Sequence, residues 1–134
     1  MSSRSTHRIS GGLDGPLRAR ELALGVLAAK TDGRPGLVED LRLLVSELAT
    51  NSLLHGGVAE DGEFILAIEV NDVIRIEVID QGSGFQPGTR LPHPDAGGYG
   101  LKLVDRIAQR WGVDLDKKGS THVWFELEPS AYAA

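Results

Sequence analysis

Hydrophobic positions change their spacing along the chain from about every 3.6 residues to every second residue. Apolar side chains at helical spacing predict one helix over residues 16–30 and a second over residues 37–55, which ends at a pair of glycines. Alternation over residues 64–70 and 73–80 then predicts two strands, joined by a two-residue hairpin at the Asn-Asp dipeptide between them. Two helices therefore precede the first hairpin.

The second half of the chain begins with a long loop. Residues 81–99 contain five of the 17 glycines, and helical spacing resumes over residues 100–111 before two strands at 113–117 and 122–128. A loop of this length in a compact domain usually has a function. The order of elements predicts an α+β fold, a two-layer sandwich in which three helices cover one face of a mixed, mostly antiparallel sheet.

A length of 134 residues suits one domain, which we expect over residues 13–128. Residues 1–12 are rich in Ser, Gly and Arg, so we expect a mobile tail there, with a short edge strand at 7–10. Residues 129–134 form a short C-terminal tail in this interpretation.

Composition excludes several classes of function. With 14 Lys and Arg against 19 Asp and Glu, the net charge of −5 argues against nucleic acid or an anionic membrane as the main partner. The chain has no Cys, which removes disulfides, thiolate zinc sites and thiol nucleophiles. No signal peptide and no apolar run of membrane-spanning length occur, so we expect a cytoplasmic protein.

The second predicted helix carries two polar residues that could do chemistry. Glu47 and Asn51 lie one turn apart at the border of the apolar stripe. A carboxylate and a carboxamide so placed could supply a general base and an oxygen ligand for Mg²⁺. Taken alone, they are also typical of a solvated helix edge. His55, one turn further, could be a ligand or could cap the helix end.

Asp80 ends the second predicted strand on the same face as three apolar residues, so this carboxylate is expected to point inward and to need a partner. It could accept a hydrogen bond from the amino group of a nucleobase, while Gly82 and Gly84 would let the ligand approach the backbone. The alternative is an Asp-led turn that closes the strand. The spacing does not match a dinucleotide-binding fingerprint.

Glycines also stand where the long loop enters the third predicted helix. Backbone N–H groups at a helix start favour anions, so Gly98, Gly100 and Leu101 could contact phosphates, although a glycine hinge is the alternative. Thr121, before the last strand, could offer its hydroxyl to a ligand or pair across strands. Taken together, a base and metal ligand, a nucleobase acceptor and a phosphate loop describe an ATP pocket.

Four segments in order resemble the motifs of a known family. Residues 47–57 are similar to its N box, 78–85 to its first glycine box, 97–113 to its second, and 119–127 to its closing strand. The family is the ATP-binding domain shared by DNA gyrase, histidine kinases and MutL. Within it the chain resembles the short bacterial anti-sigma-factor serine/threonine kinases, over about residues 13–128.

The resemblance implies a role for each matching residue. Asn51 would bind a Mg²⁺ ion that bridges the nucleotide phosphates, and Glu47 would deprotonate the attacking hydroxyl. Asp80 would bind the adenine amino group with Thr121 supporting it through water, and residues 86–97 would form a lid. Backbone contacts to the nucleotide would come from the remaining motif positions: Gly82 and Gly84 at the adenine, and Gly98, Gly100 and Leu101 at the phosphates.

Members of this subgroup hold a sigma factor inactive and phosphorylate an anti-anti-sigma protein of the STAS type, and the resemblance also allows a homodimer. One departure concerns catalysis. Related kinases often carry an Arg in or near the lid, where this chain has Asp95, Ala96 and Tyr99, so Arg90 or Arg18 would have to substitute. The alternative function is a non-catalytic regulatory module that binds partners in a nucleotide-dependent way.

Overall fold

The computed structural model describes residues 3–54, 62–80 and 101–133. Its centre is a five-stranded sheet in the order β1-β2-β3-β5-β4, in which every neighbouring pair is antiparallel. The strands are β1 (Ser3–Ser10), β2 (Glu63–Val70), β3 (Ile74–Asp80), β4 (Arg110–Leu115) and β5 (Thr121–Leu127). The last strand of the chain therefore lies inside the sheet, between β3 and β4.

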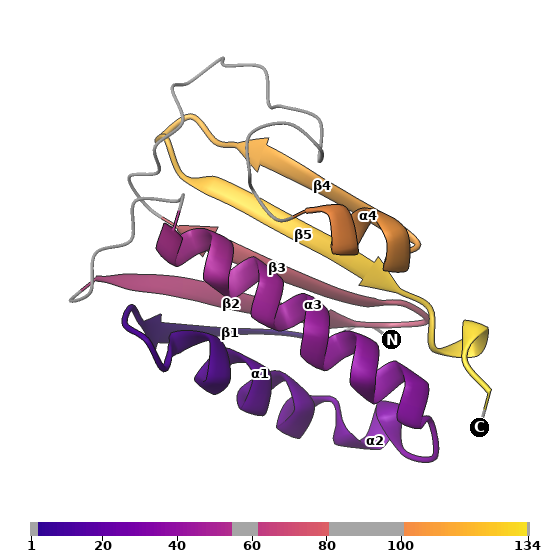
Figure 1. The fold of residues 1–134 in the computed structure, drawn as a ribbon. Coiled ribbons are helices and arrows are strands. Elements are labelled where there is room, and N and C mark those ends of the chain that lie inside the picture. The colour runs from indigo at the N-terminus through magenta and orange to yellow at the C-terminus, as the bar shows by residue number, and fades with distance from the viewer. Residues whose placement is uncertain (1–2, 55–61, 81–100, 134) are drawn as a thin grey trace.

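Helices cover one face of this sheet, which confirms the predicted two-layer α+β fold (Figure 1). Beside the long helix α3 lie α1 and α2 on one side and α4 on the other (Figure 1). The helices are α1 (Gly15–Val26), α2 (Ala28–Thr31), α3 (Pro35–Leu54) and α4 (Lys102–Ile107), and a 3₁₀ turn, η1 (Pro129–Ala131), follows the last strand. No helix in the described part of the chain is long and apolar enough to cross a membrane.

The hydrophobic core lies between the sheet and the helices. Strand alternation turns every second side chain toward the helices, so Ile76 and Val78 of β3 are fully buried beside Phe125 of β5. Helix α3 supplies the opposing surface through a stripe at helical spacing, formed by Leu37, Leu41, Leu44 and Leu48, all of them fully buried. This packing fixes the rotation of α3 over the sheet.

On the opposite face of the sheet, charged and aromatic side chains contact one another. The guanidinium of Arg75 stacks 3.9 Å from the ring centroid of Trp124 and lies 3.3 Å from the carboxylate of Glu126. The indole N–H of Trp124 donates to Asp114, so the ring lies flat over Gly112 of the neighbouring strand. A side chain at that glycine would collide with the ring.

The N-terminal segment corrects one expectation. Instead of a mobile tail with a short strand at 7–10, residues 3–10 pair with β2 along their whole length. Ile9 is the only apolar residue of β1, and it is buried. Backbone hydrogen bonds, rather than alternating hydrophobic side chains, therefore hold this strand in the sheet. The segment is the edge strand of the sheet.

The first predicted helix is broken in the structure. It ends at Val26, and Leu27 leaves the helical conformation at φ −96° and ψ 10° before the short α2 begins. Gly25 weakens the helix at this point, and burying Leu27 favours the break. The hydroxyl of Thr31 then donates to the carbonyl of Leu27 and closes α2.

Two boundaries in the sheet also differ from those expected. The β2–β3 connection has three residues rather than two, because Val70 pairs with Ile74 and the Asn71 side chain accepts a hydrogen bond from the backbone N–H of Val73. Helix α4 ends at Ile107 instead of continuing to residue 111, and Trp111 belongs to β4. Hydrogen bonding to β5 replaces helical bonding there, beginning with the N–H of residue 109.

Replacing Gly112 with Ala is expected to lower the free energy of unfolding by about 1–3 kcal/mol, because the new Cβ would overpack the site. It would lie 2.7 Å from a ring atom of Trp124. Urea unfolding followed by circular dichroism measures the change. Gly25→Ala is the matched control: apart from its own helix backbone and chain neighbours, no described atom lies within 4 Å of the Cβ position, so this variant should gain about 0.5–1 kcal/mol. Equal effects of the two changes would contradict the packing argument.

Candidate functional site

Three segments that are distant in sequence meet at one end of the sheet. Asp80 is the last residue of β3 and pairs in register with Thr121, the first residue of β5. Above them passes the end of α3, where the hydroxyl of Ser52 donates to Asp80 Oδ2 over 3.4 Å. Asn51 precedes Ser52 on the same helix. The structure thus brings the segments that carry Asn51, Asp80 and Thr121 together.

The polar side chains at this junction are buried and incompletely hydrogen-bonded. Exposed fractions are 8% for Asn51, 2% for Ser52, 2% for Asp80 and 1% for Thr121. Within the described part of the chain, no partner exists for Asn51 Nδ2, Asp80 Oδ1 or Thr121 Oγ1. Each unsatisfied buried group costs about 1–3 kcal/mol. Three of them at one place make this end of the sheet the candidate site.

The Asp80 carboxyl has an unusual environment for an acid. Burial raises its pKa to about 7, while the Ser52 hydroxyl and the charge of His122 act in the opposite direction without overcoming it. His122 lies on the other face of β5, where its ring contacts Glu77 and Asp116 at 3.2 and 3.0 Å. A ligand that donates a hydrogen bond to Asp80 would stabilise the ionised form.

Glu47 lies one turn before Asn51 on α3 and is half-buried. Burial raises the pKa of its carboxyl above the ordinary value. Among the described residues it forms no ion pair or hydrogen bond. A carboxylate that is partly desolvated and unpaired is a stronger base than an exposed one.

The remaining predicted residues fall into two groups. Leu101 is buried at the start of α4, which packs against α3, and its carbonyl accepts the N–H of Asp105 over 2.9 Å. Arg18, a candidate to replace the lid arginine, forms an ion pair with Asp14 at 3.0 Å. Outside the described residues lie His55, Gly82, Gly84, Arg90, Gly98, Gly100 and the proposed lid at 86–97.

Ser52 was missed by sequence reasoning, although a signal for it exists. It continues the buried stripe of α3 one turn beyond Leu48, so a polar residue stands at a position that faces the core. A hydroxyl at such a position must find a partner, and that partner is the Asp80 carboxylate. Ser52 therefore belongs to the same polar cluster.

Comparison with known proteins assigns the chain to a family. Residues 36–131 match the histidine kinase-, DNA gyrase B- and HSP90-like ATPase family. An anti-sigma F factor of Clostridium beijerinckii is 30% identical over 112 residues, which cover 76% of this chain and 78% of the relative. An anti-sigma F factor of Clostridium botulinum is 26% identical over 112 residues, which cover 76% of this chain and 78% of that relative. The chain therefore belongs to this ATPase family, on the branch that includes anti-sigma F factors.

The fold comparison agrees with this assignment. The crystal structure of the RsbU and RsbW domains of a Mycobacterium tuberculosis protein superposes with a TM-score of 0.67 at 16% identity. The match covers 92% of this chain but only 32% of the longer M. tuberculosis chain. At this identity the likeness concerns the fold, including the sheet whose end holds the polar cluster.

The pH dependence of stability should reveal the buried carboxyl. Folded Asp80 keeps its proton up to about pH 7, whereas the unfolded chain releases it near 3.8. Its contribution to stability is therefore complete below about pH 4 and is lost as the pH rises to 7. Asp80→Asn lacks this carboxyl. Without ligand, its unfolding free energy minus that of the wild type should therefore increase by about 2 kcal/mol from pH 5 to pH 8.

Urea titrations at the two pH values measure this difference. Asp72→Asn, in the exposed β2–β3 turn, is the control and should differ from wild type by the same amount at both. A pH-independent effect of Asp80→Asn would show that the carboxyl is not held in its neutral form.

Proposed function

We propose that this protein is an ATP-binding anti-sigma factor that also acts as a protein serine/threonine kinase on an anti-anti-sigma partner of the STAS type. The observation that carries the proposal is a set of buried polar atoms on Asn51, Asp80 and Thr121, gathered where β3, β5 and α3 meet, that find no partner in residues 3–54, 62–80 and 101–133. Membership in the ATPase family and the likeness to anti-sigma F factors support it.

Adenine matches the hydrogen-bonding capacity of the sheet end. Its exocyclic amino group donates, and Asp80 Oδ1 is a buried acceptor that no donor of the described residues reaches. The Thr121 hydroxyl can donate to or accept from a ring nitrogen or a bridging water. Ser52 holds the other Asp80 oxygen, so Oδ1 is the atom left for the base. The cluster would thus select a purine that carries an amino group.

Asn51 is suited to bind a magnesium ion together with the nucleotide. Mg²⁺ commonly takes one or two protein oxygens and completes its shell with phosphates and water, and Oδ1 of the buried Asn51 amide would be one such oxygen. The Nδ2 of Asn51, which has no partner among the described residues, would donate a hydrogen bond to a phosphate oxygen. When bound, Mg²⁺ would neutralise charge on the phosphates. Leu101, with the glycines before it, would present backbone N–H groups to them.

Glu47 would act as the general base in phosphoryl transfer. Its carboxylate would accept the proton of the partner's serine or threonine hydroxyl as that oxygen bonds to the γ-phosphorus of ATP. The bond from the γ-phosphorus to the bridging oxygen of ADP breaks, which gives ADP and a phosphorylated partner. The proton on Glu47 then passes to solvent. The raised pKa of this group brings it closer to that of a base useful near neutral pH.

A non-catalytic, nucleotide-dependent binding module is the second candidate function. It is favoured by the residues around the second glycine box, Asp95, Ala96 and Tyr99, none of which is the arginine that related kinases often use. The ion pair of Arg18 with Asp14 also engages one of the two arginines that could replace it. In this alternative ATP sets the shape of the protein without being cleaved.

The proposed partners are a sigma factor and its antagonist, and both would meet the protein in the cytoplasm. We also propose a homodimer, as the resemblance to anti-sigma-factor kinases implies. Neither partner is expected to be nucleic acid or lipid, because the net charge is −5.

Calorimetric titration with Mg-ATP tests nucleotide binding. Asp80→Asn should weaken binding by about 10–100-fold, the value of a hydrogen bond to a charged group. Asp72→Asn in the exposed turn should bind like wild type. Affinity of the wild type should also fall as the pH is lowered below about 7, because the Asp80 carboxyl then holds a proton. Unchanged affinity in Asp80→Asn would reject the adenine assignment.

Phosphorylation of a purified anti-anti-sigma partner with Mg-ATP tests the kinase assignment. Glu47→Ala should reduce transfer about 10²–10⁴-fold while ATP affinity stays nearly unchanged, because a base acts only in the transfer step. Glu39→Ala, at an exposed position on the same helix, is the control. Transfer retained in Glu47→Ala argues against its role as base. ATP-dependent partner binding with no phosphoprotein from the wild type would favour the non-catalytic module.

A further inference from the structure

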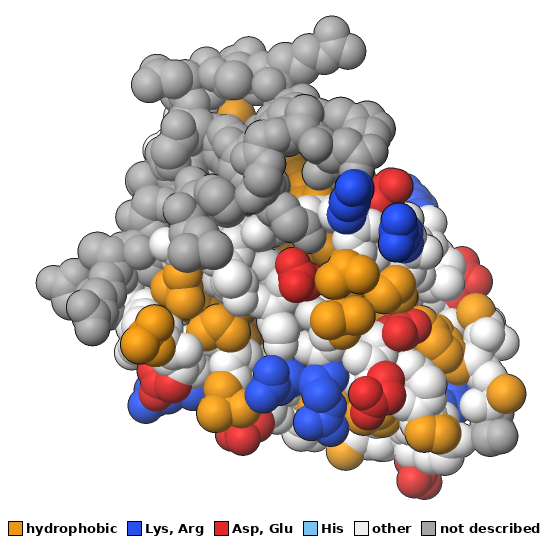
Figure 2. Space-filling model, viewed as in Figure 1, with side chains coloured by type: hydrophobic (Ala, Val, Ile, Leu, Met, Phe, Trp, Pro, Cys, Tyr) orange, Lys and Arg blue, Asp and Glu red, His pale blue; other side chains and the backbone are white. Residues whose placement is uncertain are grey.

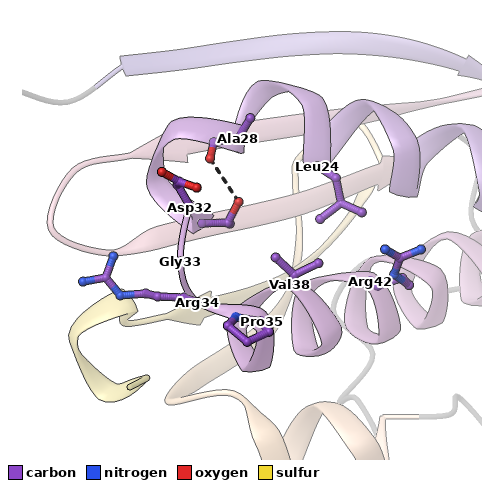
Figure 3. Close-up of a pocket in the computed structure, with 9 residues that line it drawn as sticks. Leu24, Ala28, Asp32, Gly33, Arg34, Pro35, Val38 and Arg42 are labelled. Atoms are coloured by element: carbon purple, nitrogen blue, oxygen red, sulfur yellow. Dashed lines mark hydrogen bonds between the residues drawn. The ribbon is translucent and has the colours of Figure 1, made fainter. Parts of the chain in front are cut away.

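A groove lies between the end of α1, the short α2 and the start of α3. Its volume is about 480 Å³, and its floor is apolar, formed by Leu24 of α1 and Val38 of α3 with Ala28 and Pro35 beside them. Figure 3 shows Leu24 and Val38 pointing toward each other from the two helices. Both are only half-buried, so apolar surface remains available to a partner.

The break at Leu27 creates this groove. It turns the chain away from the axis of α1, and Gly33, with φ of +74°, completes the reversal into α3. Thr31 anchors the reversal because its hydroxyl donates to the carbonyl of Leu27 and to that of Ala28. Figure 3 draws the bond to Ala28 as a dashed line. The groove is thus held by hydrogen bonds within the turn.

Basic side chains flank the apolar floor. Arg34 and Arg42 line the groove toward its two ends, and among the described residues neither forms an ion pair. Arg34 Nε is buried and has no hydrogen-bond partner within that part of the chain. Asp32 is the one carboxylate that lines the groove. The chain as a whole carries a net charge of −5, whereas two arginines and one carboxylate line this groove.

The surface over α1 and α3 shows the same mixture. Hydrophobic side chains lie next to basic and acidic ones on the helical face of the molecule (Figure 2). Further along the same seam, Arg20 of α1 donates to the Ser46 hydroxyl of α3, and its Nε also lacks a partner among the described residues. A second arginine with an unpartnered Nε among the described residues therefore lies on the same seam as the groove.

This groove is separate from the proposed nucleotide site. Val38 and Asn51 lie near opposite ends of α3, and at about 1.5 Å per residue they are roughly 20 Å apart along the helix axis. A molecule could occupy the groove while the polar cluster at the sheet end binds nucleotide.

We propose that the groove docks an acidic amphipathic helix of a partner protein. Apolar side chains of that helix would cover Leu24 and Val38, and its carboxylates would pair with Arg34 and Arg42. Arg34 lies in the turn just before α3 and Arg42 lies within that helix, so the two arginines flank the groove. Carboxylates about two turns apart on a docked helix would pair with them. Arginine forks bind carboxylates with two hydrogen bonds, and the apolar floor favours a peptide over a nucleic acid.

A fluorescein-labelled synthetic helical peptide tests the proposal. The probe carries leucines in its centre and glutamates two turns apart, and a second peptide carries lysines in place of the glutamates. Fluorescence polarisation should detect binding of the first peptide alone. In ¹⁵N NMR spectra, shifts should gather at Leu24, Gly33 and Val38. The double change Arg34→Glu with Arg42→Glu should weaken binding of the acidic peptide by at least about tenfold.

Arg4→Glu with Arg8→Glu is the matched control, since both arginines are exposed on β1 and lie outside the groove. It should leave peptide affinity unchanged. Val38→Ser, checked for folding by circular dichroism, should weaken binding without altering charge. The proposal is overturned if the acidic peptide does not bind at about millimolar concentration, if both peptides bind alike, or if the groove and control variants behave alike. Displacement of the peptide by inorganic phosphate or by a single-stranded oligonucleotide would also overturn it.

Discussion

The alternation of β3 places a carboxylate inside the protein, and the proposed site depends on that constraint. Ile74, Ile76 and Val78 turn toward the helices, so Asp80, two positions further, must do the same. Among the described residues, the Ser52 hydroxyl is the only side-chain group that donates a hydrogen bond to the Asp80 carboxyl. An acid in this position destabilises the empty protein at neutral pH, and such a cost is typical of a site shaped for a ligand.

Helix α3 connects this constraint to the rest of the molecule. Its apolar stripe fixes its rotation over the sheet, and that rotation determines where Glu47, Asn51 and Ser52 lie near its end. The same helix begins at the reversal after α2, where Arg34 and Arg42 flank an apolar groove. One rigid element thus supports two separate surfaces, and its length keeps them apart.

Strongly periodic segments were predictable from sequence, and weakly patterned ones were not. Helix α3 and strand β5 lie within a residue or two of their expected bounds. Strand β1 was underestimated because backbone pairing with β2, which leaves no hydrophobic pattern, holds it. The apolar spacing placed Trp111 at the end of the third predicted helix, but in the structure its backbone pairs with β5 instead. At the site, the inward direction of Asp80 followed from alternation, whereas its contact with Ser52 depends on how α3 crosses the sheet.

Strand β5 is the last strand in sequence but occupies an interior place in the sheet, between β3 and β4. Thr121, at its start, is the register partner of Asp80. During synthesis on the ribosome, β1, β2, β3 and the helices before them emerge first and still lack this neighbour. The polar cluster proposed to bind adenine is therefore complete only after residues 121–127 have left the exit tunnel, so a nascent chain would gain its proposed ligand site late.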